Sequence, residues 1–227
     1  MADEPNDPVL AVLSGLSCSA LSDALDRLGM PGSAHGIAPL ANGQRMAGRA
    51  FTVRYGPASV PVGTVGDYID DLVAGTVVVL DNGGRTDCTV WGDILTAMAT
   101  RNHLAGTAIH GVCRDVHRAL SAGYPIYSAG RFMRTGKDRV EVVETGGAVS
   151  LGDVQVRPLD VVVGDDDGVV VVPAGEASRV AEVAQEIVGR EAAILADALE
   201  SGSLREARAR HGYHTLQRAR AEAGGAG

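Results

Sequence analysis

The sequence predicts an α/β fold, and three observations support this class. Short apolar runs of strand length alternate with amphipathic helical segments between residues 67 and 130, over short links. Beyond Arg139 the pattern changes to Val-rich β segments separated by Gly-rich turns, followed by an amphipathic helix over 176–200. Strands that alternate with helices over short links are typical of parallel strand–helix–strand units. We therefore expect a buried parallel sheet, a β-rich C-terminal half and a terminal helix.

The first elements follow from the spacing of apolar residues. Residues 9–30 carry leucine and alanine at helical spacing, and Gly29 is a natural stop. Ser19 or Ser22 is expected to start the second half of this helical region. The segment 49–56 alternates between apolar and polar residues, which predicts a half-buried strand.

Residues 67–130 supply the predicted parallel units. A short helix over 67–75 precedes the continuous apolar run "TVVVLD" (76–81), which is typical of a strand covered on both faces. The units that follow are a helix over 93–103, a strand over 106–111, a helix over 115–123 and a strand over 125–130.

The C-terminal part is predicted to combine strands with helices. The stretches "VEVVE", "VSLGDVQVRP" and "DVVVGDDDGVVVVP" predict strands. The "DDDG" at 165–168 predicts a tight hairpin, because a calcium loop would need spaced ligands and a distal glutamate. We expect a single domain over 1–200 and an Arg/Ala-rich helical tail over 201–227 that frays or packs on a neighbouring subunit.

Composition and charge restrict the class of partner. The chain has 227 residues, 45% hydrophobic and 4% aromatic, so one large core of Val, Ala, Leu and Ile is expected. A net charge of −8 disfavours binding to nucleic acid or to anionic membranes. Three widely spaced cysteines without a CxxC motif indicate a reduced protein. No secretion signal and no apolar run of roughly 20 residues is visible, so we expect a soluble cytoplasmic protein.

Lysine usage excludes one class of carbon–carbon chemistry. Of the 20 basic residues only Lys137 is a lysine, and it lies in the turn-like "RTGKDR". A Schiff-base mechanism needs a desolvated lysine in a pocket, for which this position is not a candidate. Carbon–carbon chemistry in this chain would therefore need another electron sink, and a divalent metal ion is the obvious one.

Three charged residues are predicted to meet at the ends of two neighbouring elements. Asp93 follows a Trp-Gly pair at the start of a helix, and 20 residues separate it from the Arg114-Asp115 pair that ends the next strand. The carboxyl ends of neighbouring strands in an open α/β sheet face one crevice. The alternative is that Asp93 and Asp115 merely cap their own helices, which contributes about 0.5–2 kcal/mol each.

The chemistry of these groups suits a metal ion and an organic acid. The first backbone amides of a helix bind a small carboxylate or phosphate readily. Two carboxylates with one guanidinium suit Mg²⁺ or Mn²⁺, since Mg²⁺ keeps several waters and takes only one or two protein carboxylates. A 2-oxo acid could then replace two waters, while Arg114 holds an organic acid or polarises a carbonyl.

Other sites compete with this interpretation. His110, Cys113 and His117 lie close in sequence, but their spacing does not match a standard zinc motif. Cys113 as a nucleophile lacks an evident pair of base and orienting group. No GxGxxG or Walker loop is present, so nucleotide or S-adenosylmethionine binding is unsupported.

These residues resemble the signature of a known family. An aspartate, 20 intervening residues and an Arg-Asp pair resemble the pattern of the 4-hydroxy-4-methyl-2-oxoglutarate / 4-carboxy-4-hydroxy-2-oxoadipate aldolase family, which also contains the ribonuclease E regulator RraA. The resemblance covers nearly all of residues 10–190 and includes "LSDALDRLG" (21–29), "AGRAFTVR" (47–54), "VVVLDNGG" (77–84), "WGDILTAMA" (91–99), "GVCRD" (111–115) and "GYPIYSAG" (123–130). It implies a three-layer α/β/α catalytic domain related to swivelling phosphohistidine domains. It also implies a homotrimer, or a hexamer made of two trimers, with sites at subunit interfaces.

The resemblance also implies roles for individual residues. Asp115 would be the direct Mg²⁺ or Mn²⁺ ligand, Arg114 would contact substrate and stabilise the developing enolate, and Asp93 would hold a catalytic water. The backbone amides from Gly92 through Ile94 to Leu95 would bind the pyruvyl carboxylate. The chain departs from the family at His110, where aspartate is common. It departs again at "GSAHGIAP", which offers His35 in the stretch where the aldolases supply a neighbouring subunit with an acidic residue.

The implied function is that of a class II pyruvate aldolase. Such a lyase cleaves a 4-hydroxy-2-oxo di- or tricarboxylic acid, such as 4-hydroxy-4-methyl-2-oxoglutarate, to pyruvate and a second oxo acid, and it decarboxylates oxaloacetate as a side activity. Two alternatives stay open. One is a non-catalytic regulator of a ribonuclease, and the other is a lyase of the same family with a different acid substrate. A methyltransferase is rejected for want of a cofactor loop.

Overall fold

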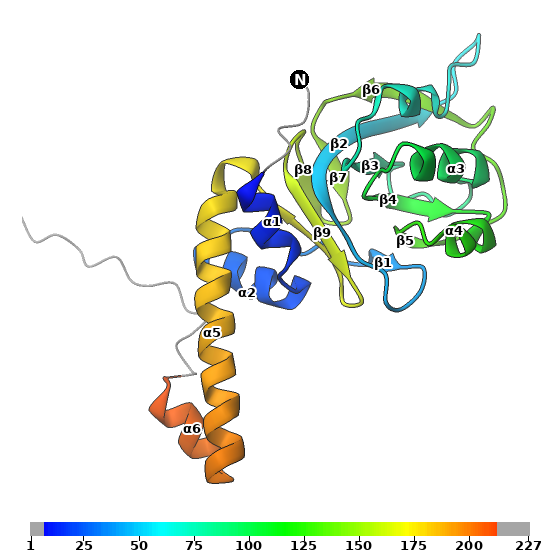
Figure 1. Ribbon diagram of the computed structural model, residues 1–227. Coiled ribbons are helices and arrows are strands. Elements are labelled where there is room, and N and C mark those ends of the chain that lie inside the picture. Colours follow the sequence, from blue (N-terminus) through cyan, green and yellow to red (C-terminus); the bar gives the residue numbers. More distant parts are fainter. Residues whose placement is uncertain (1–6, 213–227) are drawn as a thin grey trace, which may run out of the picture.

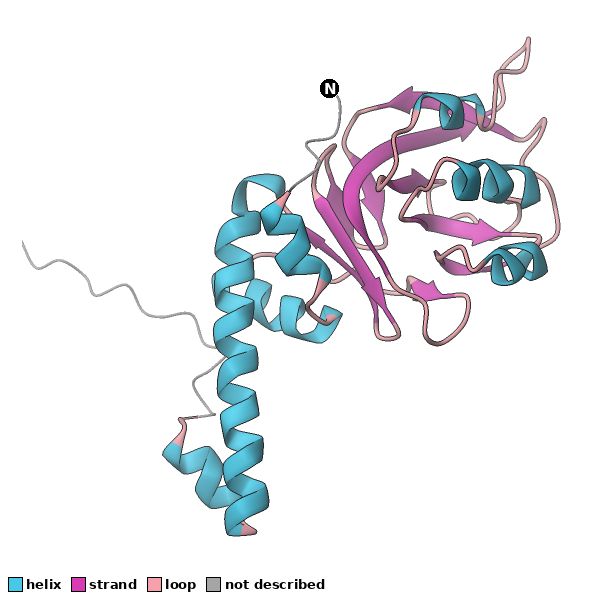
Figure 2. Ribbon diagram, viewed as in Figure 1, coloured by secondary structure: helices cyan, strands magenta, loops and turns pink. Residues whose placement is uncertain are grey.

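The computed structural model describes residues 7–212 and is built around one eight-stranded sheet (Figures 1 and 2). Its strand order is β1-β5-β4-β3-β2-β9-β10, with β6 paired to β2. The parallel part contains β2 (Met46–Pro57), β3 (Val77–Asp81), β4 (Gly106–Cys113) and β5 (Ile126–Arg131). The antiparallel strands are β1 (Ala38–Pro39), β6 (Val140–Thr145), β9 (Val161–Asp165) and β10 (Gly168–Val172), and β7 (Val149–Leu151) pairs with β8 (Val154–Val156) apart from this sheet.

Strand β2 joins the two parts of the sheet because it is long enough to change partners along its length. Its first residues pair with β9 in the register Ala47↔Val163, and its middle pairs with β3 in the register Thr52↔Val79. In Figure 1 this strand curves over the middle of the molecule, so that β9 and β10 turn away from the parallel strands. Each face of the sheet is therefore turned toward a separate group of helices.

The helices lie on opposite sides of the curled sheet (Figure 2). One group comprises α3 (Asp93–Arg101), α4 (Val116–Ala122) and the 3₁₀ helix η1 (Asp67–Asp71), which share a core with β3 and β4. The other comprises α1 (Pro8–Ser14), α2 (Cys18–Leu28), the 3₁₀ helix η2 (Ala174–Glu176) and α5 (Ala177–Ser201), of which α1, α2 and α5 bury the outer face of β9 and β10. A third core lies inside the curl, against β7 and β8. The predicted α/β class with helical outer layers is confirmed.

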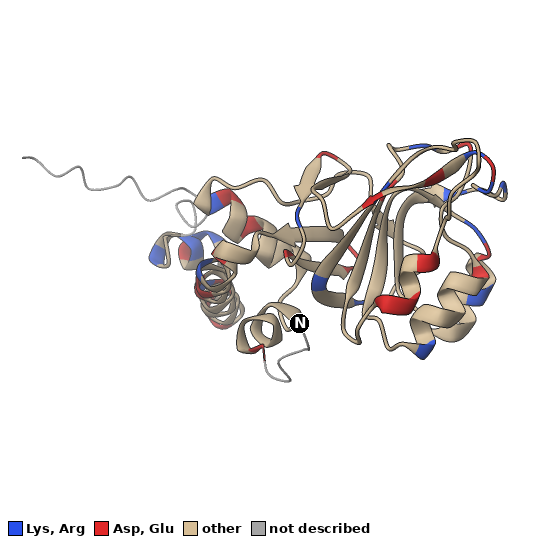
Figure 3. Cartoon of the chain, turned by 90° about the horizontal axis from the view of Figure 1, so that it is seen from above, with Lys and Arg blue, Asp and Glu red and all other residues tan. Residues whose placement is uncertain are grey.

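Several predicted elements are confirmed, with shifted boundaries. The strands over 76–81, 106–111 and 125–130 correspond to β3, β4 and β5, and the hairpin at 165–168 is formed by the pair Asp165↔Gly168. The 67–75 helix is a 3₁₀ turn of five residues that ends at Asp71, and the 93–103 helix ends at Arg101. Charged residues are few in the central strands and gather on helices and at strand ends, as Figure 3 shows.

The N-terminal helical region differs from the prediction in where it is broken. The expected start at Ser19 or Ser22 is wrong, because Ser17 caps α2 by accepting a hydrogen bond from the Ala20 amide. The axes of α1 and α2 meet at 114°. No single helix within residues 7–212 is long and apolar enough to cross a membrane, and only this bent pair reaches the required length and composition when its two helices are taken together.

The C-terminal helix extends beyond the body of the molecule (Figure 1). Helix α5 confirms the predicted helix over 176–200, and α6 (Leu204–Arg210) folds back against it. Arg210 and His211 both contact the carboxylate of Asp197, at 2.8 and 3.2 Å. The rest of the predicted tail, 213–227, lies outside the described residues.

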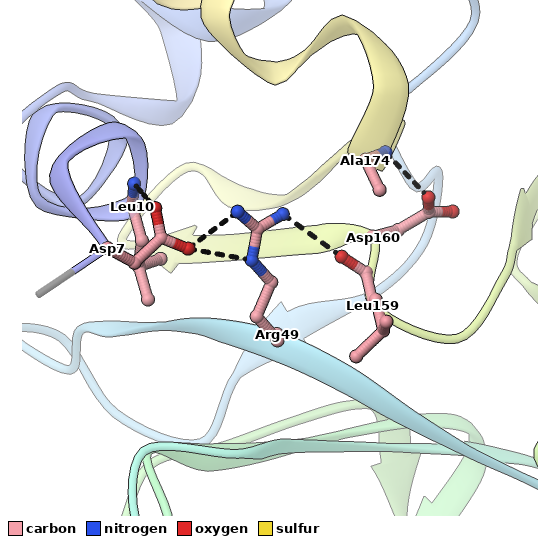
Figure 4. A network of polar contacts seen from close by, with 6 residues as sticks. All are labelled: Asp7, Leu10, Arg49, Leu159, Asp160 and Ala174. Atoms are coloured by element: carbon pink, nitrogen blue, oxygen red, sulfur yellow. Dashed lines mark hydrogen bonds and ion pairs between the residues drawn. The ribbon is translucent and has the colours of Figure 1, made fainter. Parts of the chain in front are cut away.

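A polar network ties the N-terminal helix to the sheet (Figure 4). The Asp7 carboxylate caps α1 by accepting from the Leu10 amide at 2.9 Å and pairs with Arg49 Nη2 at 2.6 Å. Arg49 also donates to the Leu159 carbonyl, while Asp160 accepts from the Ala174 amide. Burial opposes ionisation of Asp7, but the Leu10 amide and the Arg49 guanidinium outweigh it and lower the pKa of this carboxyl.

The lowered pKa of Asp7 predicts a pH-dependent contribution to stability. Replacing Arg49 with methionine should reduce the free energy of unfolding at pH 7 by up to about 1 kcal/mol. The loss should shrink as the pH falls below the ordinary range of an aspartate, because protonated Asp7 no longer attracts Arg49. Urea unfolding of Arg49→Met and of the parent at pH 7 and pH 3 measures this. Arg54→Met, which removes a more exposed ion pair with Glu144, is the control and should reduce the free energy of unfolding by less than Arg49→Met does.

Two glycines of contrasting environment supply a second test. A Cβ at Gly48 would overlap the backbone carbonyl of Gly75, whereas at Gly189, inside α5, it would meet nothing within 4 Å. Gly48→Ala should lower the melting temperature because backbone must move, and Gly189→Ala should raise the stability by roughly 0.5–1 kcal/mol. Calorimetry of both variants gives the sign of each change, and equal changes in the two would contradict the packing of β2.

Candidate active site

The candidate site is built where the loop before α3 meets the end of β4. The Arg114 amide donates to the Trp91 carbonyl at 3.1 Å, which holds the two segments together. Gly92 precedes the first turn of α3, and Asp115 precedes the first turn of α4. The structure thus brings Asp93 close to the Arg114-Asp115 pair, from which 20 intervening residues separate it in the sequence.

Asp115 is held in an unusual backbone conformation. Its φ of 55° and ψ of 34° lie in the left-handed region, which costs a residue with a side chain on the order of 1 kcal/mol. Its carboxylate does not cap α4. Instead, its Oδ2 accepts from the Asp93 amide at 3.1 Å and lies 3.2 Å from Arg114 Nε. The alternative that Asp115 is simply the cap of its own helix is therefore wrong.

Gly92 makes this arrangement possible because it has no side chain. A Cβ at this position would lie 2.8 Å from Asp115 Oδ2 and 3.1 Å from Arg114 Nε. Its φ of −148° is open to any residue, so the requirement is for space and not for backbone freedom. Any side chain at Gly92 would push the Arg-Asp pair away from the start of α3.

The buried side chain of Trp91 supports the start of α3. Trp91 donates through Nε1 to Thr96 Oγ1 at 3.0 Å, and Thr96 Oγ1 in turn donates to the Gly92 carbonyl at 2.9 Å. The Trp91 ring stacks on Tyr124, with centroids 6.1 Å apart and planes 6° apart. These contacts fix the position of the first amides of α3 relative to the core.

Two amides of the predicted carboxylate cradle already have partners. The Asp93 amide donates to Asp115, and the Ile94 amide donates to Asp93 Oδ1 at 2.9 Å. Within residues 7–212 the Leu95 amide donates to no acceptor. A substrate carboxylate that uses the whole cradle must therefore displace the side chains of Asp93 and Asp115.

The site opens into a cavity of about 430 Å³. All five residues predicted to bind substrate line it, namely Gly92, Asp93, Ile94, Leu95 and Arg114. Asp115 lies behind them, in contact with Arg114 and the Asp93 amide. Asp115 does not line the cavity itself, and the binding and catalytic roles of all these residues stay predictions.

Sequence reasoning missed one cation of this cavity. Lys137 lines its rim because Thr135 pairs with Thr89 across the loop and Gly136 packs against the Thr89 carbonyl. The side chain of Lys137 is exposed, so it lacks the burial of a Schiff-base lysine and is instead available to an anionic ligand. The only available signal was that a single lysine occurs in the chain.

The competing zinc site is not assembled. Within residues 7–212 no group of three His, Cys, Asp or Glu side chains lies close enough to hold a metal ion. His110 Nδ1 lies 3.3 Å from Asp81 Oδ1 and packs under Gly84. His35 lines a different cavity, together with Cys18 and Ser19. Neither histidine is part of the cavity beside Arg114.

The residues present fit an open magnesium-type site. Asp115 supplies one partly exposed carboxylate, and its Oδ1 accepts no hydrogen bond from residues 7–212. One carboxylate is compatible with Mg²⁺ or Mn²⁺, because such ions fill most of their positions with water and substrate oxygens. Asp93 lines the same cavity, and its Oδ1 accepts from the Ile94 amide.

Comparison with known proteins identifies the family. The pattern of the RraA-like family, described as Aldolase/RraA, matches residues 18–171. The chain belongs to the RraA-like family. A protein of Halalkalibacterium halodurans, provisionally named 4-hydroxy-4-methyl-2-oxoglutarate aldolase, is 32% identical to this RraA-like chain over 169 residues, or 74% of this chain and 77% of the other. DlpA of Legionella pneumophila is 38% identical over 168 residues, but these are 73% of this chain and only 27% of DlpA.

Solved structures confirm the RraA-like fold. An uncharacterized protein from Pseudomonas syringae pv. tomato superposes with a TM-score of 0.82 at 39% identity, over 91% of this chain and 100% of the other. Streptomyces coelicolor RraAS2, an unusual member of the RNase ES inhibitor RraA protein family, superposes with a TM-score of 0.73 at 26% identity, over 82% of this chain and 94% of the other.

The burial of Cys113 predicts how the thiol at the edge of the site behaves. Burial raises the pKa of Cys113, so little thiolate is present near neutral pH. Iodoacetamide at pH 8 should modify Cys113 much more slowly in the native chain than in urea, as followed by peptide mass spectrometry. Modification of native Cys113 as fast as free cysteine would contradict its burial and reopen the nucleophile alternative.

Proposed function

We propose that this chain is a divalent-metal-dependent lyase that cleaves a 4-hydroxy-2-oxo acid to pyruvate and a second carbonyl compound. The observation that carries the proposal is the contact of Asp115 with Arg114 and with the first amide of α3, beside a cavity that Arg114 and Asp93 line. The name of the Halalkalibacterium relative supports the same reaction class. By resemblance, the substrates are di- or tricarboxylic acids such as 4-hydroxy-4-methyl-2-oxoglutarate, with oxaloacetate decarboxylation as a side activity.

Each residue of the site has a chemical task in this reaction. Asp115 would hold Mg²⁺ or Mn²⁺, which when bound supplies a Lewis acid for the 2-oxo group. Arg114 is a permanent cation at the cavity floor and would stabilise the negative charge that develops as the C3–C4 bond breaks. Asp93 would hold the water that takes the proton of the C4 hydroxyl. The amides from Gly92 to Leu95 would bind the carboxylate of the pyruvyl half.

The assembly of the active protein is also a proposal. By resemblance we infer a homotrimer, or a hexamer of two trimers, in which a neighbouring subunit borders the site. Ile94 at the cavity mouth is 76% exposed in the single chain, which such a neighbour would cover. Light scattering coupled to size-exclusion chromatography measures the assembly directly.

A charge-only substitution tests the metal ligand. Asparagine tolerates the left-handed backbone of Asp115, so Asp115→Asn should keep the fold and remove the carboxylate. Pyruvate release, coupled to lactate dehydrogenase, should fall by at least about 100-fold in Asp115→Asn and on addition of chelator. Asp26→Asn, on the exposed face of α2, is the matched control and should keep the parent rate. Arg114→Lys should also lower the rate of pyruvate release by about 100-fold, because lysine keeps the positive charge but lacks the planar guanidinium group that binds a carboxylate through two hydrogen bonds.

The outcomes separate the proposed lyase from its alternatives. Full activity in Asp115→Asn or in chelator would contradict the metal-dependent reaction. If borohydride trapped pyruvate covalently on Lys137, the reaction would proceed through a Schiff base and not through a metal ion. Absence of pyruvate release from every 4-hydroxy-2-oxo acid and from oxaloacetate would remove the lyase altogether.

A ribonuclease regulator is the second candidate function. The observation that favours it is the likeness to RraAS2, whose name places it in a family of ribonuclease inhibitors. A regulator acts through its surface, so Asp115→Asn would leave its effect on a ribonuclease unchanged. Purified chain added to a ribonuclease assay, with and without this substitution, distinguishes the two functions.

A further inference from the structure

Part of the cavity beside Arg114 is formed by η1 and the loop that precedes it. Five of the residues that line the cavity belong to this surface, which we call the η1 wall: Val65, Gly66, Asp67, Ile69 and Asp70. Arg114 and Asp93 line the same cavity. A ligand that fills the cavity therefore contacts the η1 wall as well as the charged residues of the candidate site.

A buried phenol attaches the η1 wall to the sheet. Tyr55 of β2 is 7% exposed, and its hydroxyl donates to the Val65 carbonyl at 2.7 Å. The same hydroxyl lies 3.2 Å from the hydroxyl of Tyr68 in η1. Because a carbonyl cannot donate, the single proton of Tyr55 belongs to the bond with Val65, and Tyr68 is the donor in the tyrosine pair. The hydrogen bonds thus run from Tyr68 through Tyr55 to Val65.

Burial keeps both hydroxyls in their donating form. It raises the pKa of Tyr55 and of Tyr68 well above the ordinary value of a tyrosine. Both side chains are therefore protonated at neutral pH, and the bond to the Val65 carbonyl does not depend on pH in the working range.

Other hydrogen bonds hold the η1 wall on either side of Val65. The Val142 amide of β6 donates to the Thr64 carbonyl at 2.9 Å, and Asn102 Nδ2 donates to the Ile69 carbonyl at 3.1 Å. Within residues 7–212 no second donor reaches the Val65 carbonyl. The position of Val65, which itself lines the cavity, therefore depends on the tyrosine hydroxyl.

The charged residues of the candidate site are held by different contacts. The Arg114 amide donates to the Trp91 carbonyl, and the Asp115 carboxylate accepts from the first amide of α3. In the part of the chain that the structure describes, no hydrogen bond or ion pair joins the η1 wall to Arg114 or Asp115. The wall meets α3 through an apolar contact instead, since a Cβ at Gly66 would lie 2.7 Å from Leu95 Cδ2. The wall can therefore shift while the charged residues stay in place.

We propose that Tyr55 is a positioning residue for substrate binding, whose hydroxyl fixes the η1 wall against which the substrate lies, an inference that rests on the proposed lyase function. Without this hydroxyl the Val65 carbonyl has no donor in the protein and moves toward water. A displaced wall weakens contacts that substrate and transition state share, which raises KM and leaves kcat unchanged. Tyr55 does not touch the reacting atoms.

Two tyrosine variants of the full chain test the proposal. Tyr55→Phe removes the hydroxyl and keeps the ring. Tyr127→Phe is the matched control, because Tyr127 is also buried and its hydroxyl donates to the Gln44 carbonyl at 2.9 Å, outside the lining of the cavity. With Mg²⁺ and 4-hydroxy-4-methyl-2-oxoglutarate, KM for pyruvate release should rise about fivefold in Tyr55→Phe, with kcat within about twofold of the parent. Tyr127→Phe should change neither constant by more than about twofold, even though it loses an equivalent hydrogen bond.

A variant of a less buried residue guards against a Tyr55→Phe chain that fails to fold. Asn102→Ala removes the bond to the Ile69 carbonyl of the same wall, at the end of α3. It should also raise KM without lowering kcat, because it releases the η1 wall and not the charged residues. An unchanged KM in Asn102→Ala would show that the wall does not contribute to binding and would overturn the proposal.

Hydrogen exchange followed by mass spectrometry supplies a measurement that does not need the reaction. In Tyr55→Phe the amides of residues 65–70 should exchange faster than in the parent, while those of 93–101 keep their rate. In Tyr127→Phe the amides of 65–70 should exchange as in the parent.

The possible failures are distinguishable. An unchanged KM in Tyr55→Phe, a fall in kcat, or an equal rise of KM in both tyrosine variants overturns the role of Tyr55 and leaves the lyase standing. Absence of pyruvate from the parent overturns the lyase, and hydrogen exchange then decides whether Tyr55 fixes the wall. Unchanged exchange of residues 65–70 in Tyr55→Phe would overturn the proposal in that case too.

Discussion

The contact between the Asp115 carboxylate and the first amide of α3 organises this molecule. It links two consecutive strand–helix units at the carboxyl edge of the sheet, where the chain leaves β4 and where it enters α3. The contact requires a left-handed backbone at Asp115 and the absence of a side chain at Gly92. Both features are unfavourable for an isolated chain, so the surrounding fold has to maintain them. The site therefore depends on the completed sheet and not on either loop alone.

The support for this contact is apolar and buried, which gives it rigidity. Trp91 lies between Thr96 and Tyr124, and through the Thr96 hydroxyl it controls the carbonyl from which the first turn of α3 begins. On the other side of the cavity the pair Tyr55 and Tyr68 holds η1 in the same manner. Arg114, whose Nε lies 3.2 Å from Asp115 Oδ2, is thus presented next to a rigid, uncharged aromatic support.

The polarity of the cavity sets what the site can bind. Its lining combines the cations Arg114 and Lys137 with the carboxylates of Asp67, Asp70 and Asp93 and with apolar side chains of α3. The chain belongs to the RraA-like family, whose description covers both aldolases and RraA proteins. The loop before η1 is held to the sheet, because the Tyr55 hydroxyl of β2 donates to the Val65 carbonyl and the Val142 amide of β6 donates to the Thr64 carbonyl.

The sequence by itself determined the α/β class, strands β3 to β5, the hairpin after Asp165 and the residues Asp93, Arg114 and Asp115, because apolar periodicity and motif spacing are local properties of the chain. It could not place the break before α2, which a single hydrogen bond to Ser17 decides. Only the tertiary structure could show that Asp115 contacts a neighbouring helix, or that Lys137 reaches the cavity through the pairing of Thr135 with Thr89. Such contacts join residues far apart in the chain, and their geometry depends on how the curled sheet brings its loops together.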